Sequence, residues 1–264
     1  MLNTLKSEWT KLHTTRSFWW TTFIFLFFVW GWAILNARLT QPAETPEDVE
    51  LGMGIITPDG AVTFLFSLGL PVLMIQAIMI VTTEYRFGTQ TITFMATPRR
   101  WSVAVVKLLM YAVIAAALTF VAVVGAYLLT EFFAHDEVAA QFQPWDDEMG
   151  QKQLWKYPLA AALLVLFSQG LGLLLRSTAG SVAIGLILFL GVDNLVAALP
   201  KFGSKLVNFM PFKSFQSWLW EIDPVDAPWK DNWVFCLVFI AWSLLLWVLG
   251  VIVLQKRDVC TFKA

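Results

Sequence analysis

The sequence predicts an all-α integral membrane protein with six transmembrane helices in a single membrane domain. Of its 264 residues, 58% are hydrophobic and 14% are charged, whereas soluble domains are about half apolar and a quarter charged. The mean hydropathy is +0.67, and six stretches of 19–24 residues carry at most one charge each. The composition therefore argues against a soluble enzyme and against a disordered chain.

The six apolar stretches mark the predicted spans. A helix rises about 1.5 Å per residue, so about 20 residues cross a hydrocarbon core of about 30 Å. The predicted spans are residues 18–37, 61–83, 102–130, 158–175, 180–199 and 232–254. A cleaved signal peptide is the alternative for the first stretch. Its apolar run exceeds the usual length of about 7–15 residues, and no small-residue cleavage site follows it, so we interpret it as a retained span.

The distribution of Lys and Arg predicts the orientation. The two termini, together with the segments between the second and third spans and between the fourth and fifth, hold eleven cations and three acids. The segments on the other side hold seven cations and fifteen acids. Because positive charge stays cytoplasmic, we expect both termini on the cytoplasmic side of the plasma membrane. The net charge of −1 offers no basic face for nucleic acid.

Residues 1–17 are predicted to form an amphipathic helix that lies in the inner membrane interface. Leu2, Leu5, Trp9 and Leu12 recur at spacings of three and four residues, which places them on one helical face. A short polar leader with scattered leucines is the simpler alternative.

The outer segments are acidic and aromatic. For residues 132–157 a solvated loop is the simplest interpretation, and a gate that attracts cationic amphipathic ligands is the alternative. Residues 201–231 are apolar and aromatic but are interrupted by Pro211 and Lys213. Irregular backbone at membrane depth survives only against protein or a watery cavity. We therefore predict an outer re-entrant or interfacial segment there, near a translocation mouth.

Residues 84–100 join the second and third predicted spans on the cytoplasmic side. Thr83 is predicted to cap a short helix, Glu84 suits its positive end, and Pro98 stops it. Apolar residues such as Ile92 and Phe94 are costly on a bare loop, and the groove of a partner protein would accommodate them. Three cations are expected to extend to the lipid headgroups: Arg99, Arg100 and Lys107.

This segment resembles the cytoplasmic loop of actinobacterial permeases of the ATP-binding-cassette (ABC) type-2 exporter family. Their pattern is E-Y-R-x-G-T-x-x-x-T-L-x-x-x-P-R-R. The residues that match it, with Phe94 in place of the usual Leu, are Glu84, Tyr85, Arg86, Gly88, Thr89, Thr93, Phe94, Pro98, Arg99 and Arg100. The opening Ser7–Leu12 and Thr15–Ser17 also resemble the family's S-E-x-x-K-L-x-x-x-R-S start.

The resemblance implies that this chain pairs with a second permease, identical or different, and that each permease docks on a cassette ATPase subunit. Residues 84–100 would act as the coupling segment that transmits closure of the ATPase to the spans. The N-terminal helix would be the connecting helix. ATP and Mg²⁺ would bind to the ATPase, and this chain would hold no cofactor. Ordinary positive-inside charge is the alternative explanation for Arg86, Arg99 and Arg100.

Motifs for chemistry on this chain are absent from the sequence. It contains no G-x-x-x-x-G-K-[ST] phosphate loop and no H-E-x-x-H zinc motif. Its two histidines, His13 and His135, are far apart in the chain, so we expect neither a metal site nor enzymatic activity.

Three polar residues inside predicted spans are ambiguous: Gln76, Gln169 and Asp193. Intramembrane ionisable residues are functional candidates by default, and Asp193 is the one acid in a predicted span. Interhelical hydrogen bonds worth about 0.6–2 kcal/mol are the simpler explanation for the two glutamines.

The function expected from these observations is export of a hydrophobic or amphipathic compound, such as a drug, a peptide antibiotic or a lipid. Two permeases would work by alternating access. A non-transport accessory or assembly subunit of a membrane complex is the alternative. An intramembrane enzyme is disfavoured because the few polar residues in the spans do not form a catalytic set.

Overall fold

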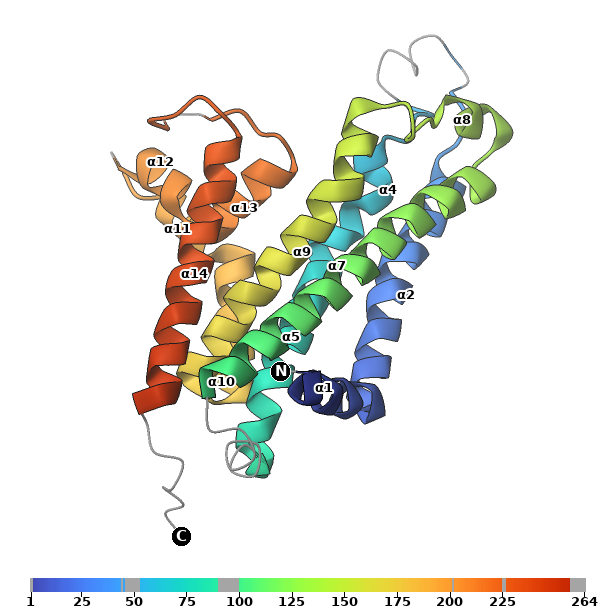
Figure 1. Cartoon of the computed structure of the whole chain (residues 1–264). Coiled ribbons are helices and arrows are strands. Elements are labelled where there is room, and N and C mark those ends of the chain that lie inside the picture. Colours follow the sequence, from blue (N-terminus) through green and yellow to red (C-terminus); the bar gives the residue numbers. More distant parts are fainter. Residues whose placement is uncertain are drawn as a thin grey trace. The chain divides into compact units, whose positions relative to one another are not determined.

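The computed structural model describes residues 2–43, 45, 53–89, 100–200, 202–224 and 227–256. In these residues all regular elements are helices. Five helical stretches are long and apolar enough to cross a membrane, and Figure 1 shows them as the long ribbons. They are α2 (Arg16–Leu39), α4 to α5 (Pro58–Phe87), α7 (Arg100–Phe133), α9 (Glu148–Leu175) and α14 (Trp233–Lys256). The chain is therefore a multi-pass membrane protein, and five of the six predicted spans correspond to these helices.

The helices extend beyond the predicted spans because uncharged stretches mark only the apolar part of a helix. The span predicted for 158–175 belongs to α9, which already begins at Glu148. Glu, Gln and Lys are good helix formers, so the polar residues 148–156 continue the same helix. For the same reason α7 runs from Arg100 to Phe133 rather than from 102 to 130.

The fifth predicted span differs from the others. Residues 180–199 fall on α10 (Thr178–Ile187), a π-helical segment (Leu188–Val192) and α11 (Asp193–Ala197). The apolar part, Thr178–Val192, is shorter than the five long helices. At about 1.5 Å per residue it covers about 22 Å of a core of about 30 Å. A six-span topology with both termini cytoplasmic stays a prediction.

The second long helix contains an interruption. The Thr57 side chain accepts a hydrogen bond from the Gly60 amide, and Pro58 occupies the first turn, so α4 (Pro58–Phe64) starts with a regular N-cap. A π-helical segment (Leu65–Gly69) then precedes α5 (Leu70–Phe87). Pro71 has no amide hydrogen for the regular ladder, which accounts for irregular hydrogen bonding one turn before it.

The chain divides into two compact units, and each is described by itself. The second unit comprises residues 17–73 and 115–161. In it the Trp30 indole donates to the Ala122 carbonyl at 3.2 Å, next to Gly125, where any added Cβ would meet the Trp30 ring. Trp32 stacks on Phe64 with ring centroids 4.1 Å apart. The core of this unit thus contains an aromatic stack and a large indole packed against small residues.

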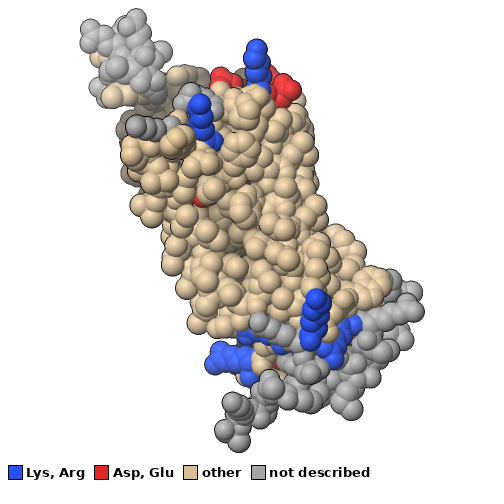
Figure 2. Space-filling model, turned by 90° about the vertical axis from the view of Figure 1, so that its left-hand side faces the viewer, with Lys and Arg blue, Asp and Glu red and all other residues tan. Residues whose placement is uncertain are grey.

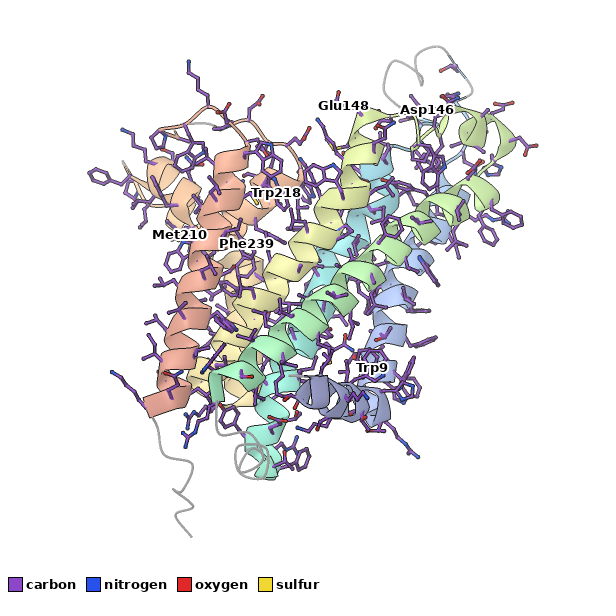
Figure 3. All side chains as sticks on the ribbon, in the orientation of Figure 1. Trp9, Asp146, Glu148, Met210, Trp218 and Phe239 are labelled. Atoms are coloured by element: carbon purple, nitrogen blue, oxygen red, sulfur yellow. The ribbon has the colours of Figure 1, made fainter. Side chains whose placement is uncertain are left out.

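The first unit comprises residues 1–16, 74–114 and 162–264. Its upper core is aromatic, because α13 (Pro211–Leu219) packs along α14. The Phe215 and Phe239 rings lie 4.4 Å apart, and Phe167 lies 5.0 Å from Phe212. Figure 3 labels Trp218 and Phe239 at this contact.

Residues 203–219 form two short helices of the first unit, α12 (Gly203–Leu206) and α13, joined by a 3-10 turn (Val207–Phe209). They fall in the segment 201–231 that we predict to be re-entrant. Its depth in a membrane stays a prediction.

The lower half of the first unit depends on a close approach of α9 to α14. A Cβ built on Gly170 would lie 2.6 Å from the Trp247 backbone nitrogen, and one built on Gly250 would lie 2.8 Å from the Leu173 Cβ. Only glycine permits such backbone contact. The opposite side of α14 exposes apolar residues such as Val248 and Ile252. In Figure 2 a broad uncharged surface on this side of the unit separates the charged side chains at its two ends.

Candidate functional site

The residues Glu84, Tyr85 and Arg86 form the end of α5. We predicted that Thr83 caps a separate short helix, and this is wrong. The Thr83 hydroxyl donates to the Met79 carbonyl at 2.6 Å inside α5, which continues to Phe87. Gly88, with a φ of +66°, follows directly. Its left-handed conformation is typical of the residue after a helix C-terminus.

The rest of the predicted coupling segment is only partly described. Thr89 follows Gly88 and is exposed, and Arg100 opens α7. Thr93, Phe94, Pro98 and Arg99 lie outside the described residues, as do Ile92 and Met95. The described parts of the segment are therefore its two ends, residues 84–89 and Arg100.

The first end joins a cluster of four charged side chains, which we call the charge cluster: Glu8, Lys11, Glu84 and Lys107. Lys11 donates to Glu8 and to Glu84 at 2.8 Å each. Lys107 donates to Glu84 at 2.9 Å and also to Glu8. Two carboxylates and two ammonium groups thus alternate, and they tie α1 (Leu2–Thr14) to α5 and α7.

Burial makes this cluster unusual. The side chains of Glu8 and Lys107 are 3% and 7% exposed. An unpaired charge at such a depth is strongly unfavourable, so each group depends on its partners. Lys11 is more exposed. Partial burial alone would lower its pKa, but hydrogen bonds to Glu8 and Glu84 raise the pKa of Lys11 above its ordinary value. The favourable contribution is therefore complete at neutral pH and is lost only as the pH rises through that raised pKa.

One expectation for this end is wrong. We predicted that Lys107 extends to the lipid headgroups. Instead it points inward to two carboxylates, which neutralise it where an unpaired ammonium group would be strongly unfavourable. A lysine seven residues inside a long apolar helix was the available signal, since an intramembrane cation requires a partner.

Two guanidinium groups meet the C-terminal end of α14. Arg100 donates to the Leu254 carbonyl at 3.4 Å, and Arg176 donates to the Val253 carbonyl at 3.3 Å. These carbonyls belong to the last turn of α14, where carbonyl groups lack helical partners and the helix dipole is negative. Arg176 also lies over the Tyr85 ring, 5.2 Å from its centroid. In the sequence Arg176 is one cytoplasmic-side cation among eleven, and no local pattern distinguishes it.

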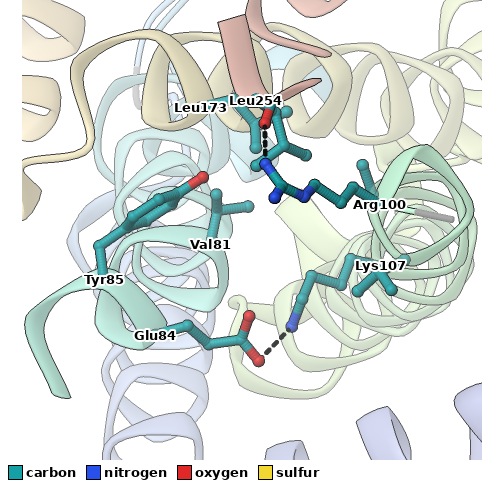
Figure 4. Close-up of a pocket in the computed structure, with 9 residues that line it drawn as sticks. Val81, Glu84, Tyr85, Arg100, Lys107, Leu173 and Leu254 are labelled. Carbon is teal, nitrogen blue, oxygen red and sulfur yellow. Dashed lines mark hydrogen bonds and ion pairs between the residues drawn. The ribbon is translucent and has the colours of Figure 1, made fainter. Parts of the chain in front are cut away.

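A small pocket separates these two groups of charges. Figure 4 shows Tyr85, Arg100 and Lys107 around it, with the apolar side chains of Val81 and Leu254 beside them. The enclosed space is about 20 Å³, which is room for about one water molecule. Helices α5, α7, α9 and α14 all contribute to its lining. A pocket of this size cannot enclose a transported compound.

Arg86 lies apart from these contacts. It is exposed near the end of α5, and its guanidinium group is 5.6 Å from the Phe87 ring centroid. Phe87 is itself 70% exposed. An exposed Arg and aromatic pair at a helix end is typical of a contact surface for another protein.

The three ambiguous polar residues are all buried. The Tyr111 hydroxyl donates to the Gln76 side chain at 2.6 Å, and Gln169 donates to the Lys107 carbonyl at 3.4 Å. Asp193 accepts a hydrogen bond from the Lys213 backbone amide, so it caps the N-terminal turn of α13 from outside that helix. The structure does not bring these residues together into one site.

The Gln76 contact yields a direct test. We expect Tyr111→Phe to lower the free energy of unfolding by about 1–2 kcal/mol, because it removes the donor of a buried hydrogen bond between α7 and α5. Urea unfolding in detergent would measure the loss. In the Gln76→Leu background the same change should cost less. An equal cost in both backgrounds would show that this hydrogen bond contributes nothing.

Comparison with known proteins does not assign the chain to a family: no protein-family model matches it, and no curated protein matches it.

Proposed function

We propose that the chain is the membrane-spanning permease subunit of an ATP-driven exporter of the ABC type-2 family. The main support for the proposal is that Glu84 forms ion pairs with Lys11 and Lys107. Glu84 begins the segment that resembles the family's coupling loop, and two ammonium groups hold it to α1 and α7. A force on the segment would therefore act on three helices together rather than on one loose loop.

The mechanism follows from that attachment. ATP and Mg²⁺ bind to a separate cassette ATPase, and its closure displaces the segment 84–100 on the cytoplasmic side. The charge cluster makes α1, α5 and α7 share the displacement. Binding energy at the ATPase then favours one of two arrangements of the spans, which is a shift of populations. A second permease, identical or different, completes the transport pathway.

The expected cargo is hydrophobic or amphipathic. The buried polar side chains of the long helices are largely engaged with one another or with backbone, as for Gln76 and Gln169. Such an interior offers few groups that could replace the hydration of a sugar or an ion. ATP-dependent uptake of a lipophilic compound into inside-out vesicles would support this assignment, and a sugar or an ion as sole cargo would refute it.

The ATPase partner is tested by identifying the neighbouring open reading frame and, if it encodes a cassette ATPase, by co-expressing that ATPase with this chain. We expect the two proteins to co-purify in a fixed ratio. Arg86→Ala should weaken the complex about 10-fold, because an exposed arginine next to an aromatic residue is a typical interface hot spot. Quantitative binding of the purified ATPase to immobilised permease would measure the change.

A matched control is Arg38→Ala. Arg38 also lies over a phenylalanine, with its guanidinium group 5.1 Å from the Phe133 centroid, but it belongs to α2. It should leave ATPase binding unchanged. If the wild-type chain binds no ATPase, the accessory-subunit alternative is favoured. If Arg86→Ala and Arg38→Ala change ATPase binding equally, Arg86 is not part of the interface.

A further inference from the structure

Both ends of the predicted coupling segment are attached to the last turn of α14. At one end, Arg100 donates to the Leu254 carbonyl at 3.4 Å. At the other end, the guanidinium group of Arg176 lies 5.2 Å from the Tyr85 ring centroid and donates to the Val253 carbonyl at 3.3 Å. The Leu254 side chain is also buried among apolar residues of α5, α7 and α9, which are Val81, Ala104 and Leu173. Polar and apolar contacts thus fix the end of α14 to the segment.

Arg176 makes its contacts from a backbone conformation that favours glycine. Its φ is +54°, in the left-handed region. It directly follows α9, and its amide donates to the Gly172 carbonyl at 3.0 Å, as is typical of a helix end. A glycine would adopt this conformation without strain. The contacts of the guanidinium group with Tyr85 and Val253 are therefore what arginine adds at this position.

The other end of α14 contacts the two short helices of residues 203–219. The Phe239 ring lies 4.4 Å from the Phe215 ring of α13, and the Trp242 indole donates to the Phe209 carbonyl at 2.9 Å. Figure 1 shows α12 and α13 beside the end of α14 that lies away from the C-terminus. At about 1.5 Å per residue, these contacts are about 20 Å from the last turn of α14. One straight helix therefore joins the coupling segment to residues 203–219.

Between its two ends, α14 meets α9 at the close backbone approach of Gly170 and Gly250. The side of α14 away from α9 exposes apolar side chains, such as Val248 and Ile252. A helix that touches its neighbour at one close contact can tilt about that contact with little change in packing elsewhere, as in hinge motions. The glycine contact is thus suited to serve as a pivot.

We propose that α14 is a lever that carries a displacement of the coupling segment to residues 203–219, and that Arg176 is the positioning residue that joins α14 to Tyr85. The source of the displacement rests on the proposed function, whereas the lever is a property of this chain alone. When the segment moves, Arg100 and Arg176 move the last turn of α14. The contact with α9 then makes the other end of α14, with α13, move in the opposite sense.

The lever is tested on the purified full chain without any ATPase, by hydrogen exchange in detergent. Arg176→Gly removes the guanidinium group and suits the positive φ, so the fold should be retained. We expect about 5-fold faster exchange at residues 252–256 and also, at the far end of α14, at residues 207–215. Arg100→Gln, which releases the other attachment, should give the same pattern at both places.

Two controls separate a lever from a local structural role. Arg176→Lys retains a cationic donor beside Tyr85 and should exchange nearly as the wild type does. Arg38→Ala removes an arginine of α2 that also lies over an aromatic ring, and it should leave both regions unchanged. If Arg176→Gly changes exchange only at residues 252–256, or equally in all helices, the lever is overturned.

A second measurement connects the lever to the ATPase. Arg176→Gly should leave ATPase binding within about 2-fold of the wild type and lower the amount of compound transported per ATP hydrolysed by about 5-fold. Unchanged transport per ATP would overturn the role of the lever in coupling. If the wild-type chain binds no ATPase, the proposed function fails, and the exchange result alone decides whether α14 is a lever.

Discussion

Lys107→Met is expected to lower the free energy of unfolding by about 3–5 kcal/mol, among the largest effects of any single substitution in this chain. The variant removes one of the two ammonium groups that neutralise Glu8 and Glu84. The Glu8 carboxylate, 3% exposed, then keeps Lys11 as its remaining ion-pair partner among the described residues. Methionine is unbranched and nearly as long as lysine but carries no charge. The loss of stability therefore reports the missing charge rather than a change in packing. Urea unfolding in detergent micelles would measure it.

Two controls define the result. In the double variant Glu8→Gln, Lys107→Met one carboxylate and one ammonium group leave together, so the cost should be clearly less than the sum of the single changes. Lys152→Met breaks the exposed pair between Lys152 and Glu148 on α9, and exposed pairs contribute about 0–1 kcal/mol. If Lys107→Met costs no more than Lys152→Met, the charge cluster does not hold α1 in place.

Gly170→Ala is expected to destabilise the chain by about 1–3 kcal/mol, although alanine is the better helix former. The added Cβ would lie 2.6 Å from the Trp247 backbone nitrogen and 2.8 Å from the Leu246 carbonyl carbon. Backbone atoms cannot rotate away as a flexible side chain can, so α9 and α14 must separate. That separation also moves Leu173 and Leu254, which line the pocket. Thermal unfolding in detergent would show the lower midpoint.

The same substitution at Gly31 should have the opposite sign. Gly31 lies in α2, and a Cβ added there meets nothing within 4 Å. Gly31→Ala should stabilise the chain by about 0.5–1 kcal/mol through helix propensity alone. Equal shifts for the two variants would contradict a backbone contact between α9 and α14.

The sequence anticipated the helices better than the site. Charge-free stretches located all five long helices because a hydrocarbon core admits few other backbone structures. They misplaced the helix ends, since polar residues such as those at 148–156 extend a helix beyond the apolar stretch that hydropathy marks. Thr83 was misread for a related reason. Threonine caps helices, but inside a helix its hydroxyl bonds back to the preceding turn, here to Met79.

For the site, the local pattern marked Glu84 and Arg100 but not the residues they meet. Glu8 appeared only as a match in an N-terminal motif, and Arg176 only as one of the eleven cations that predict the orientation. Glu84 meets Lys11 across 73 residues of chain, and Arg100 meets Leu254 across 154. A single sequence does not show which distant residues lie close together in space, so local spacing could not predict these pairs.

Composition and charge placement by themselves determined a helical membrane protein, because the energetic demands of hydrocarbon act on each helix separately. Only the tertiary structure decided that Lys107 faces inward, that two arginines meet the end of α14, and that α9 touches α14 backbone to backbone. Each of these features is a contact between distant segments, and its energy depends on the three-dimensional distance between groups that the order of residues does not specify.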